Sequence, residues 1–514
     1  MGETEGNDDS RGIESIKTVA SGGALRFVGK ISNLFLGLAV QIAMARLLVT
    51  ADYGGVTLAI AVLGLTRLVA MLGIQTGVSR LYPVYEDEPA KARGVVRAAY
   101  RISTVAGLVV AVGLFLSAPI LAERVFDDGT MTQLIRIVAV FLPFGVLAEI
   151  SVSITRAARD ARPKVFIDEM FRPVARFVLI VALVYAGFRA TGAVAGHMLA
   201  YAVTGLLLLA YVYRSLPDRE VSPEPMDREL FVYSLPLLLA GGLDFLMHNI
   251  DTFMIGYFLT SELVGIYNVS YQLGTFAIFF LAAGGYLLPP MLAKLDSDGK
   301  TTQMDALYRT ITKWIVFASA PVVFLLFVYP SELIALLFGT QYTEGAIVLQ
   351  ILVLGTFLQL SMGSASGALA SLGNNRLVLY SISFGALVNV VLNVALIPAL
   401  GILGAGIATI SSLIVRDSVN SLALYRTHRL LPVGLMGVRT TAVSAAVAAG
   451  LYAVTVWSAV PAILGVALWA VVHGVAILLL GVNERDKEIF TSVEQRLGIR
   501  VPMIRRVISF GRSD

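Results

Sequence analysis

Long apolar runs, separated by short polar or turn-forming segments, fill most of the chain from about residue 22 to residue 481. Each run is close to the length of about 20 residues with which an α-helix crosses a bilayer. The pattern predicts an all-α, polytopic membrane protein with about fourteen transmembrane helices. The predicted spans are residues 22–46, 55–77, 99–121, 132–155, 166–187, 190–213, 231–257, 263–289, 308–329, 343–369, 377–397, 402–424, 437–457 and 461–481.

The composition of the chain excludes the soluble classes of protein. Of its 514 residues, 57% are hydrophobic and only 14% are charged, whereas a soluble domain carries about 25% charged residues. The net charge of +4 does not indicate a nucleic-acid partner, because basic residues gather in the cytoplasmic loops of any polytopic protein. The chain has no cysteine, which excludes disulfides and thiolate metal sites.

The positions of the basic residues predict the orientation in the membrane. Most of the 39 lysines and arginines lie on one side if the N-terminus is cytoplasmic and the spans are counted as above. The exceptions towards the outer side are Arg46, Arg124, Arg136 and Arg189. The N-terminal tail is acidic, unlike the start of a signal peptide. We therefore predict a multi-pass protein of the cell (plasma) membrane with both termini in the cytoplasm.

The two halves of the chain resemble each other. Residues 48–56 match residues 258–266 at an offset of 210, and Gly192-Ala193 matches Gly404-Ala405 at an offset of 212. Six predicted spans separate the copies, so the copies share one orientation, as in a parallel repeat. Such a repeat predicts two pseudo-symmetric lobes around a central cavity near the middle of the membrane.

The repeat and the composition together predict the organisation of the chain. The predicted parts are a cytoplasmic tail (1–21), an N-terminal lobe of spans 1–6 (22–213), a cytoplasmic linker (214–230), a C-terminal lobe of spans 7–12 (231–424), spans 13 and 14 (437–481) and a basic, amphipathic cytoplasmic tail (482–514). The apolar and arginine side chains of the last part favour a helix that lies on anionic lipid, with a mobile basic tail as the alternative.

No residue pattern indicates catalysis. Gly29-Lys30 ends like a phosphate-binding Walker A loop, but Ala24 replaces its first glycine and Ile31 replaces its Ser or Thr. The four histidines do not have the spacing of metal ligands. We predict neither an enzyme, nor a cofactor, nor a metal site.

Basic residues inside the first two spans are the strongest candidates for a binding site. Arg26 and Lys30 lie one turn apart on one helix face that Asn33 continues. Lys30 lies about 15 Å into its span, and Arg67 lies at a similar depth in the second. Because intramembrane charges are costly, they face a cavity or a partner by default. The alternative for Arg26 is that its side chain reaches the inner headgroups.

An acidic stripe in the seventh span is the second candidate. Asp244, His248 and Asp251 follow one another at i, i+4 and i+7 on one helical face. These groups suit either a coupling site for H⁺ or Na⁺ or ion pairs with the cations of spans 1 and 2. Pro236 and Gly241-Gly242, which precede the stripe, predict a kink.

Weaker candidates lie at the start of the fifth span. Arg172 and Arg176 follow Asp168 and Glu169, and Asp168 and Arg172 have the i, i+4 spacing of a helical ion pair. Their place near the predicted cytoplasmic end favours an interfacial cluster of ion pairs over a binding site. Arg416 and Asp417 in the twelfth span are a further local pair.

The sequence also resembles the polysaccharide and oligosaccharide flippases of the multidrug/oligosaccharidyl-lipid/polysaccharide exporter superfamily. Residues 389–398, Asn-Val-Val-Leu-Asn-Val-Ala-Leu-Ile-Pro, followed by Gly-Ile-Leu-Gly-Ala-Gly at 401–406, are similar to a recurring segment of that family. Residues 45–54, and Leu337-Phe338-Gly339 with Tyr342, are similar to it as well. The resemblance covers about residues 20–481.

The resemblance implies a V-shaped exporter that moves a lipid-linked oligosaccharide, carried on polyprenyl or dolichyl phosphate or pyrophosphate, from the cytoplasmic to the outer leaflet by alternating access. The transport would serve cell-surface polysaccharide or glycoprotein assembly. The substrate, membrane lipids and glycan-assembly enzymes are the implied partners, and Arg26, Lys30 and Arg67 would hold the phosphate. The first alternative is a cation-coupled multidrug or small-molecule antiporter of the same superfamily. The second is a non-transporting membrane partner of a glycan-assembly complex.

Overall fold

The computed structural model describes residue 29 and residues 32–215, 221–431, 469 and 471–475. These residues form helices joined by short turns, and no strand occurs among them. The predicted terminal tails (1–21 and 482–514), the thirteenth span and most of the fourteenth lie outside the described residues, as do Arg26 and Lys30.

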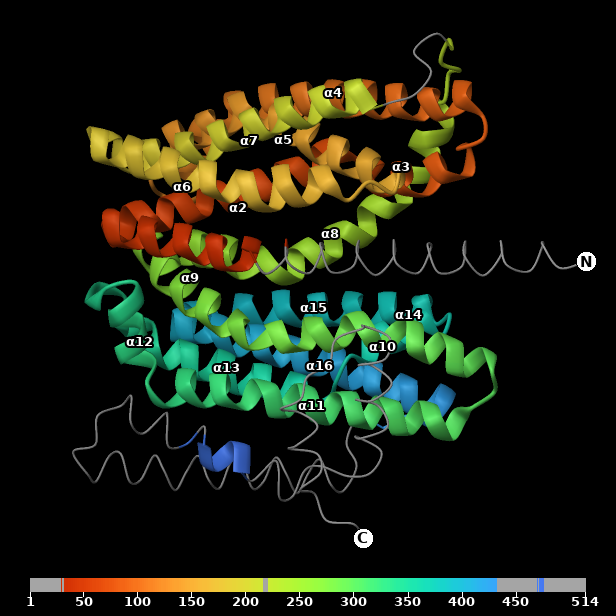
Figure 1. Ribbon diagram of the computed structural model, residues 1–514. Coiled ribbons are helices and arrows are strands. Elements are labelled where there is room, and N and C mark those ends of the chain that lie inside the picture. Colours follow the sequence, from red (N-terminus) through yellow and green to blue (C-terminus); the bar gives the residue numbers. More distant parts are fainter. Residues whose placement is uncertain (1–28, 30–31, 216–220, 432–468, 470, 476–514) are drawn as a thin grey trace, which may run out of the picture. The chain divides into compact units, whose positions relative to one another are not determined.

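The chain divides into two compact units, residues 1–268 and residues 269–514 (Figure 1). The boundary falls inside helix α9, whereas the linker predicted from the sequence, 214–230, lies within the first unit. The first unit contains the helix Ser32–Leu47 and α2 (Thr50–Met71), α3 (Ile74–Val84), α4 (Pro89–Ile120), α5 (Met131–Ala157), α6 (Arg172–Leu183), α7 (Arg189–Ser215), α8 (Asp227–Phe258) and the start of α9 (Ser261–Thr275).

The second unit continues from α9 to the end of the chain. Its described helices are α10 (Phe279–Ser297), α11 (Thr301–Val328), α12 (Pro330–Leu337), α13 (Ala346–Ser361), α14 (Ala365–Ser371), α15 (Asn375–Leu400) and α16 (Ile402–His428). Leu288, Leu292, Tyr308, Leu369 and Leu424 are fully buried in its core. In a separate buried cluster, Phe324 of α11 stacks on Trp469, a residue of the fourteenth predicted span, with 4.5 Å between the ring centroids.

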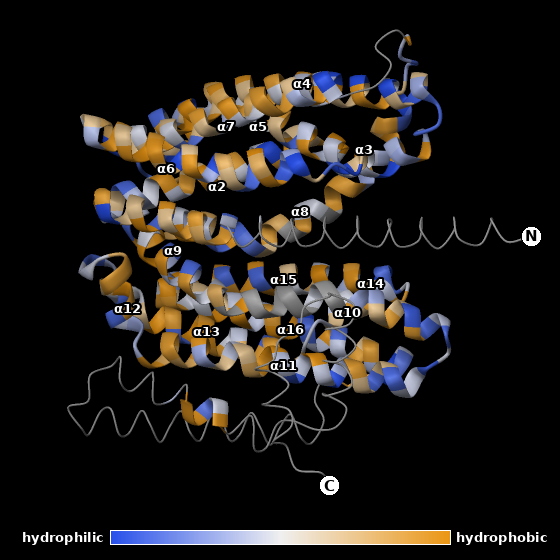
Figure 2. Cartoon of the chain, in the orientation of Figure 1, coloured by the Kyte–Doolittle hydropathy of each residue, from blue (hydrophilic) through white to orange (hydrophobic). Residues whose placement is uncertain are grey.

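Many of these helices are long and apolar enough to cross a membrane. Among the described residues eight pass this test, and α8 is a ninth if its two bent halves form one span. Hydrophilic residues gather near the helix ends and connecting turns, while apolar residues cover most of the helix surfaces (Figure 2). Leu108, Val109 and Leu116 of α4 are examples of large apolar side chains that are more than half exposed. A lipid environment gives such faces a partner, so the chain is a multi-pass membrane protein.

Helix α8 is bent where the sequence predicts a kink. Its halves, Asp227–Leu243 and Phe245–Phe258, meet at 51° directly after Gly241-Gly242. Helices bend at glycine pairs because side chains no longer restrain the backbone there.

Small residues allow close approach of the helices in both units. A Cβ on Gly196 would lie 2.7 Å from the backbone nitrogen of Ile180, so α6 and α7 touch through their backbones. In the second unit Gly404, which corresponds to Gly192, packs equally closely on the backbone of Leu396 and Ile397 in α15. In lipid, such contacts replace the hydrophobic driving force between helices.

Candidate functional site

Tyr201, near the middle of α7, is the centre of a cluster of charged residues in the first unit. Nη1 of Arg67, from α2, donates a hydrogen bond of 3.1 Å to the Tyr201 hydroxyl. The same nitrogen forms an ion pair of 3.1 Å with Oε1 of Glu149, from α5. Three helices far apart in the sequence therefore meet at one guanidinium, and its charge has a carboxylate partner.

Arg172, the first residue of α6, also lies close to Tyr201. Its guanidinium lies 4.7 Å from the centroid of the Tyr201 ring, where that of Arg67 lies 5.7 Å away. Arg172 also forms the ion pair with Asp168, at 2.7 Å, that the i, i+4 spacing predicts. Cations over an aromatic face are attracted by its quadrupole, so the ring holds two guanidinium groups near each other despite their like charge.

The backbone before Arg172 is a π-helix, η2 (Lys164–Phe171). A π-helix widens the turn and shifts the direction of side chains, and it occurs frequently at functional sites. The short segment carries Asp168 and Glu169, and Glu169 forms an ion pair of 3.5 Å with Lys164 in the same segment. The π-helix thus brings the Asp168 carboxylate to Arg172, while the Glu169 carboxylate points to Lys164.

His197 packs on the other side of the tyrosine. It precedes Tyr201 by one turn of α7, and the two rings stack with their centroids 5.3 Å apart. The histidine is 4% exposed, and its Nδ1 atom has no hydrogen-bond partner among the described residues. An unsatisfied ring nitrogen in a buried charged cluster is a polar group that a bound ligand or water can satisfy.

Arg176 differs from the other two arginines in having no carboxylate partner among the described residues. It follows Arg172 by one turn of α6, and its charge acts on Tyr201, Arg172 and His197. Its Nε atom is buried and makes no hydrogen bond in the described part of the chain. Among the described residues, the site therefore has three guanidinium groups and two carboxylates in ion pairs with them, Glu149 and Asp168. We call Arg67, Glu149, Asp168, Arg172, Arg176, His197 and Tyr201 the Tyr201 cluster.

The first helix runs alongside this cluster. A Cβ on Gly29 would overlap Oε2 of Glu169, and one on Gly37 would lie 3.9 Å from Nη2 of Arg176. Asn33 lies midway between these glycines on the same helical stripe, so it lies at the level of η2 and the start of α6. Lys30 is next to Gly29 in sequence, although its side chain is outside the described residues.

The acidic stripe of α8 divides into separate environments. The Asp251 carboxylate is 2% exposed and accepts a hydrogen bond of 2.9 Å from the Tyr267 hydroxyl, whereas the His248 side chain is exposed. The Asp244 side chain lies outside the described residues. The carboxylate that pairs with Arg67 is Glu149, on α5, rather than a residue of this stripe.

The structure unites candidates that the sequence kept apart. Arg67 was expected in mid-membrane and Arg172 and Arg176 in an interfacial cluster, yet Arg67 and Arg172 share the Tyr201 ring. Glu149 was missed, although an ionisable residue inside an apolar run is itself a signal. His197 and Tyr201 were also missed, since one histidine and one tyrosine at i, i+4 are common on helices.

The described residues contain no group of three or more His, Cys, Asp or Glu side chains that could hold a metal ion. The chemistry that the Tyr201 cluster offers is instead the binding of an anion, with guanidinium donors that suit phosphate oxygens.

Comparison with known families decides where this architecture belongs. The family model described as polysaccharide biosynthesis protein matches residues 43–347, more than half of the chain. The chain belongs to the polysaccharide biosynthesis protein family. This membership confirms the family resemblance seen in the sequence.

A curated relative of this family comes from Haloferax volcanii. It is named "Probable low-salt glycan biosynthesis flippase Agl15", and it is 25% identical over 194 residues, which are 38% of this chain and 41% of the relative. The chain spans about half the length of the curated relatives that it matches.

Solved structures share the fold. The lipid II flippase MurJ in an inward closed conformation matches with a TM-score of 0.68 at 12% identity, over 87% of this chain and 97% of that chain. An inward-facing multidrug resistance transporter of the MATE family matches with a TM-score of 0.62 at 19% identity, over 77% of this chain and 96% of that chain. At such identities the likeness concerns the fold, which both a glycolipid flippase and a drug transporter use.

Proposed function

We propose that the protein is a flippase that moves a lipid-linked oligosaccharide from the cytoplasmic to the outer leaflet by alternating access. The observation that carries the proposal is Arg176, which has no carboxylate partner in the described part of the chain, whereas the neighbouring Arg67 and Arg172 each form an ion pair with a carboxylate. The phosphate of a polyprenyl-linked or dolichyl-linked glycan is an anion that must cross a region of low dielectric. A charge-assisted pair with a guanidinium is far stronger there than in water.

The Tyr201 cluster favours a phosphate over a neutral sugar or an organic cation. Arg176 supplies the surplus positive charge, and Arg67 and Arg172 are held in place by Glu149 and Asp168. Arg26 and Lys30, on the helix whose Gly29 and Gly37 approach η2 and α6, would add further cations. The glycan would occupy the hydrated cavity and the lipid tail would stay in the bilayer.

The wider setting of the proposal follows from the family. Membership of the polysaccharide biosynthesis family and relatives named as flippases support transport rather than catalysis. Transport would take place in the plasma membrane with both termini cytoplasmic, beside the enzymes that assemble and use the glycan. Its driving force would be an H⁺ or Na⁺ gradient acting through Asp244, His248 and Asp251, or the consumption of the product.

Reconstitution tests the proposal. Purified protein would be placed in liposomes with a fluorescent polyprenyl-phosphate-linked sugar, and exposure of the sugar in the opposite leaflet would be followed over time. The parent would be compared with Arg26→Ala, Lys30→Ala, Arg67→Ala and Arg176→Gln. Arg101→Gln is the control, because Arg101 forms an exposed ion pair with Asp227 away from Tyr201.

We expect transport by the parent and by the control, and at least a tenfold loss for Arg176→Gln at an unchanged melting temperature. Equal rates in all six proteins, the control included, would refute the anion site. No transport by the parent, together with exchange of organic cations for protons, would establish the antiporter instead.

A further inference from the structure

The second unit also carries an arginine inside a membrane-spanning helix. Arg416 lies on α16, 14 residues after Ile402 and 12 before His428, so it is about 20 Å from either end. Its side chain is 15% exposed, and it forms an ion pair of 2.8 Å with the neighbouring Asp417, which is 7% exposed. Charges at that depth are costly and mark functional sites by default.

Arg416 lies on α16 between two polar contacts that join α15 and α16. Ser381 of α15 donates to Asn420 of α16 at 2.6 Å, and Asn389 of α15 donates to Ser412 of α16 at 3.3 Å. From the first contact to the second, the chain advances by eight residues on α15 (381 to 389) and goes back by eight on α16 (420 to 412), as in antiparallel helices. In this register the residue of α15 opposite Arg416 is Gly385, which lies midway between Ser381 and Asn389 and has no side chain.

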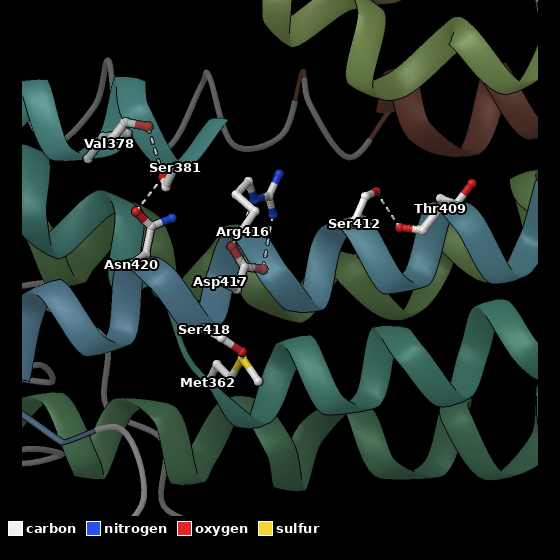
Figure 3. A network of polar contacts seen from close by, with 9 residues as sticks. All are labelled: Met362, Val378, Ser381, Thr409, Ser412, Arg416, Asp417, Ser418 and Asn420. Carbon is white, nitrogen blue, oxygen red and sulfur yellow. Dashed lines mark hydrogen bonds and ion pairs between the residues drawn. The ribbon is translucent and has the colours of Figure 1, made fainter. Parts of the chain in front are cut away.

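Within the described part of the chain, the hydrogen bonds of the Arg416 guanidinium all lie along one of its edges. Both hydrogen bonds to Asp417 come from Nε and Nη2, at 2.8 and 3.0 Å. The other terminal nitrogen, Nη1, has no hydrogen-bond partner among the residues described, and Figure 3 shows it directed away from Asp417. A carboxylate that grips one edge of an arginine fixes the direction of the other edge, which is the geometry for receiving a second anion.

The internal repeat places this arginine at a position related to the Tyr201 cluster. Helices α7 and α16 both have 27 residues, and Gly192 corresponds to Gly404 at an offset of 212. Arg416 then corresponds to Thr204, within one turn of Tyr201. Each unit thus carries an arginine in an ion pair with a carboxylate: Arg172, at the start of α6, pairs with Asp168, and Arg416, in the middle of α16, pairs with Asp417.

We propose that the second unit has its own phosphate-binding residue, Arg416, which Asp417 positions. The proposal rests on the proposed flippase function and extends it: the phosphate of the substrate has one anion site in each unit. Asp417 is a positioning residue, because it acts on the substrate through the arginine.

The experiment uses the full-length protein and two readouts. The first is transport of the fluorescent polyprenyl-phosphate-linked sugar in liposomes, and the second is binding of polyprenyl phosphate in detergent. The main variant is the double substitution Arg416→Gln with Asp417→Asn, because it removes both charges and leaves no unpaired charge buried. Arg416→Lys keeps the positive charge but removes the planar guanidinium, whose paired N–H groups can bind two phosphate oxygens at once. Arg309→Gln is the control, since Arg309 and Asp305 form a local ion pair near the start of α11.

We expect the double variant to keep the parent's melting temperature and to lose at least tenfold in transport and in phosphate affinity. Arg416→Lys should keep part of both. A double variant that binds and transports like the parent would overturn the inference while leaving the proposed flippase function intact. A double variant with a lower melting temperature but the parent's phosphate affinity and transport would overturn it as well. If the parent transports nothing, the proposed function fails separately, and phosphate affinity alone then decides on Arg416.

Discussion

The hydroxyl of Thr50 donates a hydrogen bond of 2.9 Å to the carboxylate of Glu262, joining the starts of α2 and α9. The two residues are 212 positions apart, close to the offset of 210 that relates the repeats around them. The matching segments 48–56 and 258–266 therefore contact each other directly. Glycines make this approach possible, because a Cβ on Gly54 would overlap the carbonyl oxygen of Ser261 and one on Gly265 would lie 2.8 Å from that of Thr50.

The first prediction concerns this contact. Gly54→Ala should lower the melting temperature of the purified protein by several degrees, because the new methyl group meets backbone and cannot be accommodated by rotating a side chain. Overpacking of this kind costs about 1–3 kcal/mol. Gly113→Ala in α4 is the matched control, since nothing lies within 4 Å of its added Cβ. Equal melting temperatures for the two variants would show that the two segments do not touch.

The second prediction concerns the ion pair of Arg67 and Glu149. Each of Arg67→Gln and Glu149→Gln should lower the melting temperature, because each leaves one intramembrane charge without its partner. The double variant should lose less than the sum of the two, with a coupling energy of about 1 kcal/mol. A double-mutant cycle by thermal unfolding in detergent measures this coupling. Strictly additive losses would mean that the two side chains are independent.

Tyr201 separates two contributions to the cluster. Tyr201→Phe removes the hydroxyl that accepts from Arg67 but keeps the ring against Arg172 and His197, so we expect a loss of about 1 kcal/mol. Tyr201→Ala removes the ring as well and should cost about 3–5 kcal/mol. Comparing the unfolding of the two variants checks the order. If both lose the same amount, the hydroxyl alone matters and the stacked arrangement is of no consequence.

The predicted orientation can be tested without removing any native thiol, because the chain has no cysteine. Gly129→Cys lies in the connection between the third and fourth predicted spans, and Asp298→Cys lies between the eighth and ninth. With a cytoplasmic N-terminus the first is outside and the second inside. A membrane-impermeant thiol reagent should therefore label Gly129→Cys in intact cells, and Asp298→Cys only after permeabilisation. The opposite pattern would reverse the orientation.

The sequence alone was sufficient for the class of protein, many of the spans and the repeat. A helix that crosses a bilayer needs a continuous apolar run of about 20 residues, and this property depends only on the residues of that one helix. The kink in α8 and the pair of Asp168 and Arg172 were predictable for the same reason, since both depend on residues within one or two turns.

Only the tertiary structure decided which charges meet. Arg67 and Glu149 are 82 residues apart, and Arg67 and Tyr201 are 134 apart, so no local spacing relates them. The packing of α2, α5 and α7 brings them together. The tertiary structure also shows that Arg176, on α6, has no carboxylate partner among the described residues. Likewise, the antiparallel packing of α15 and α16 sets Gly385 opposite Arg416. A charge is visible in a sequence, but its partner depends on which helices pack side by side.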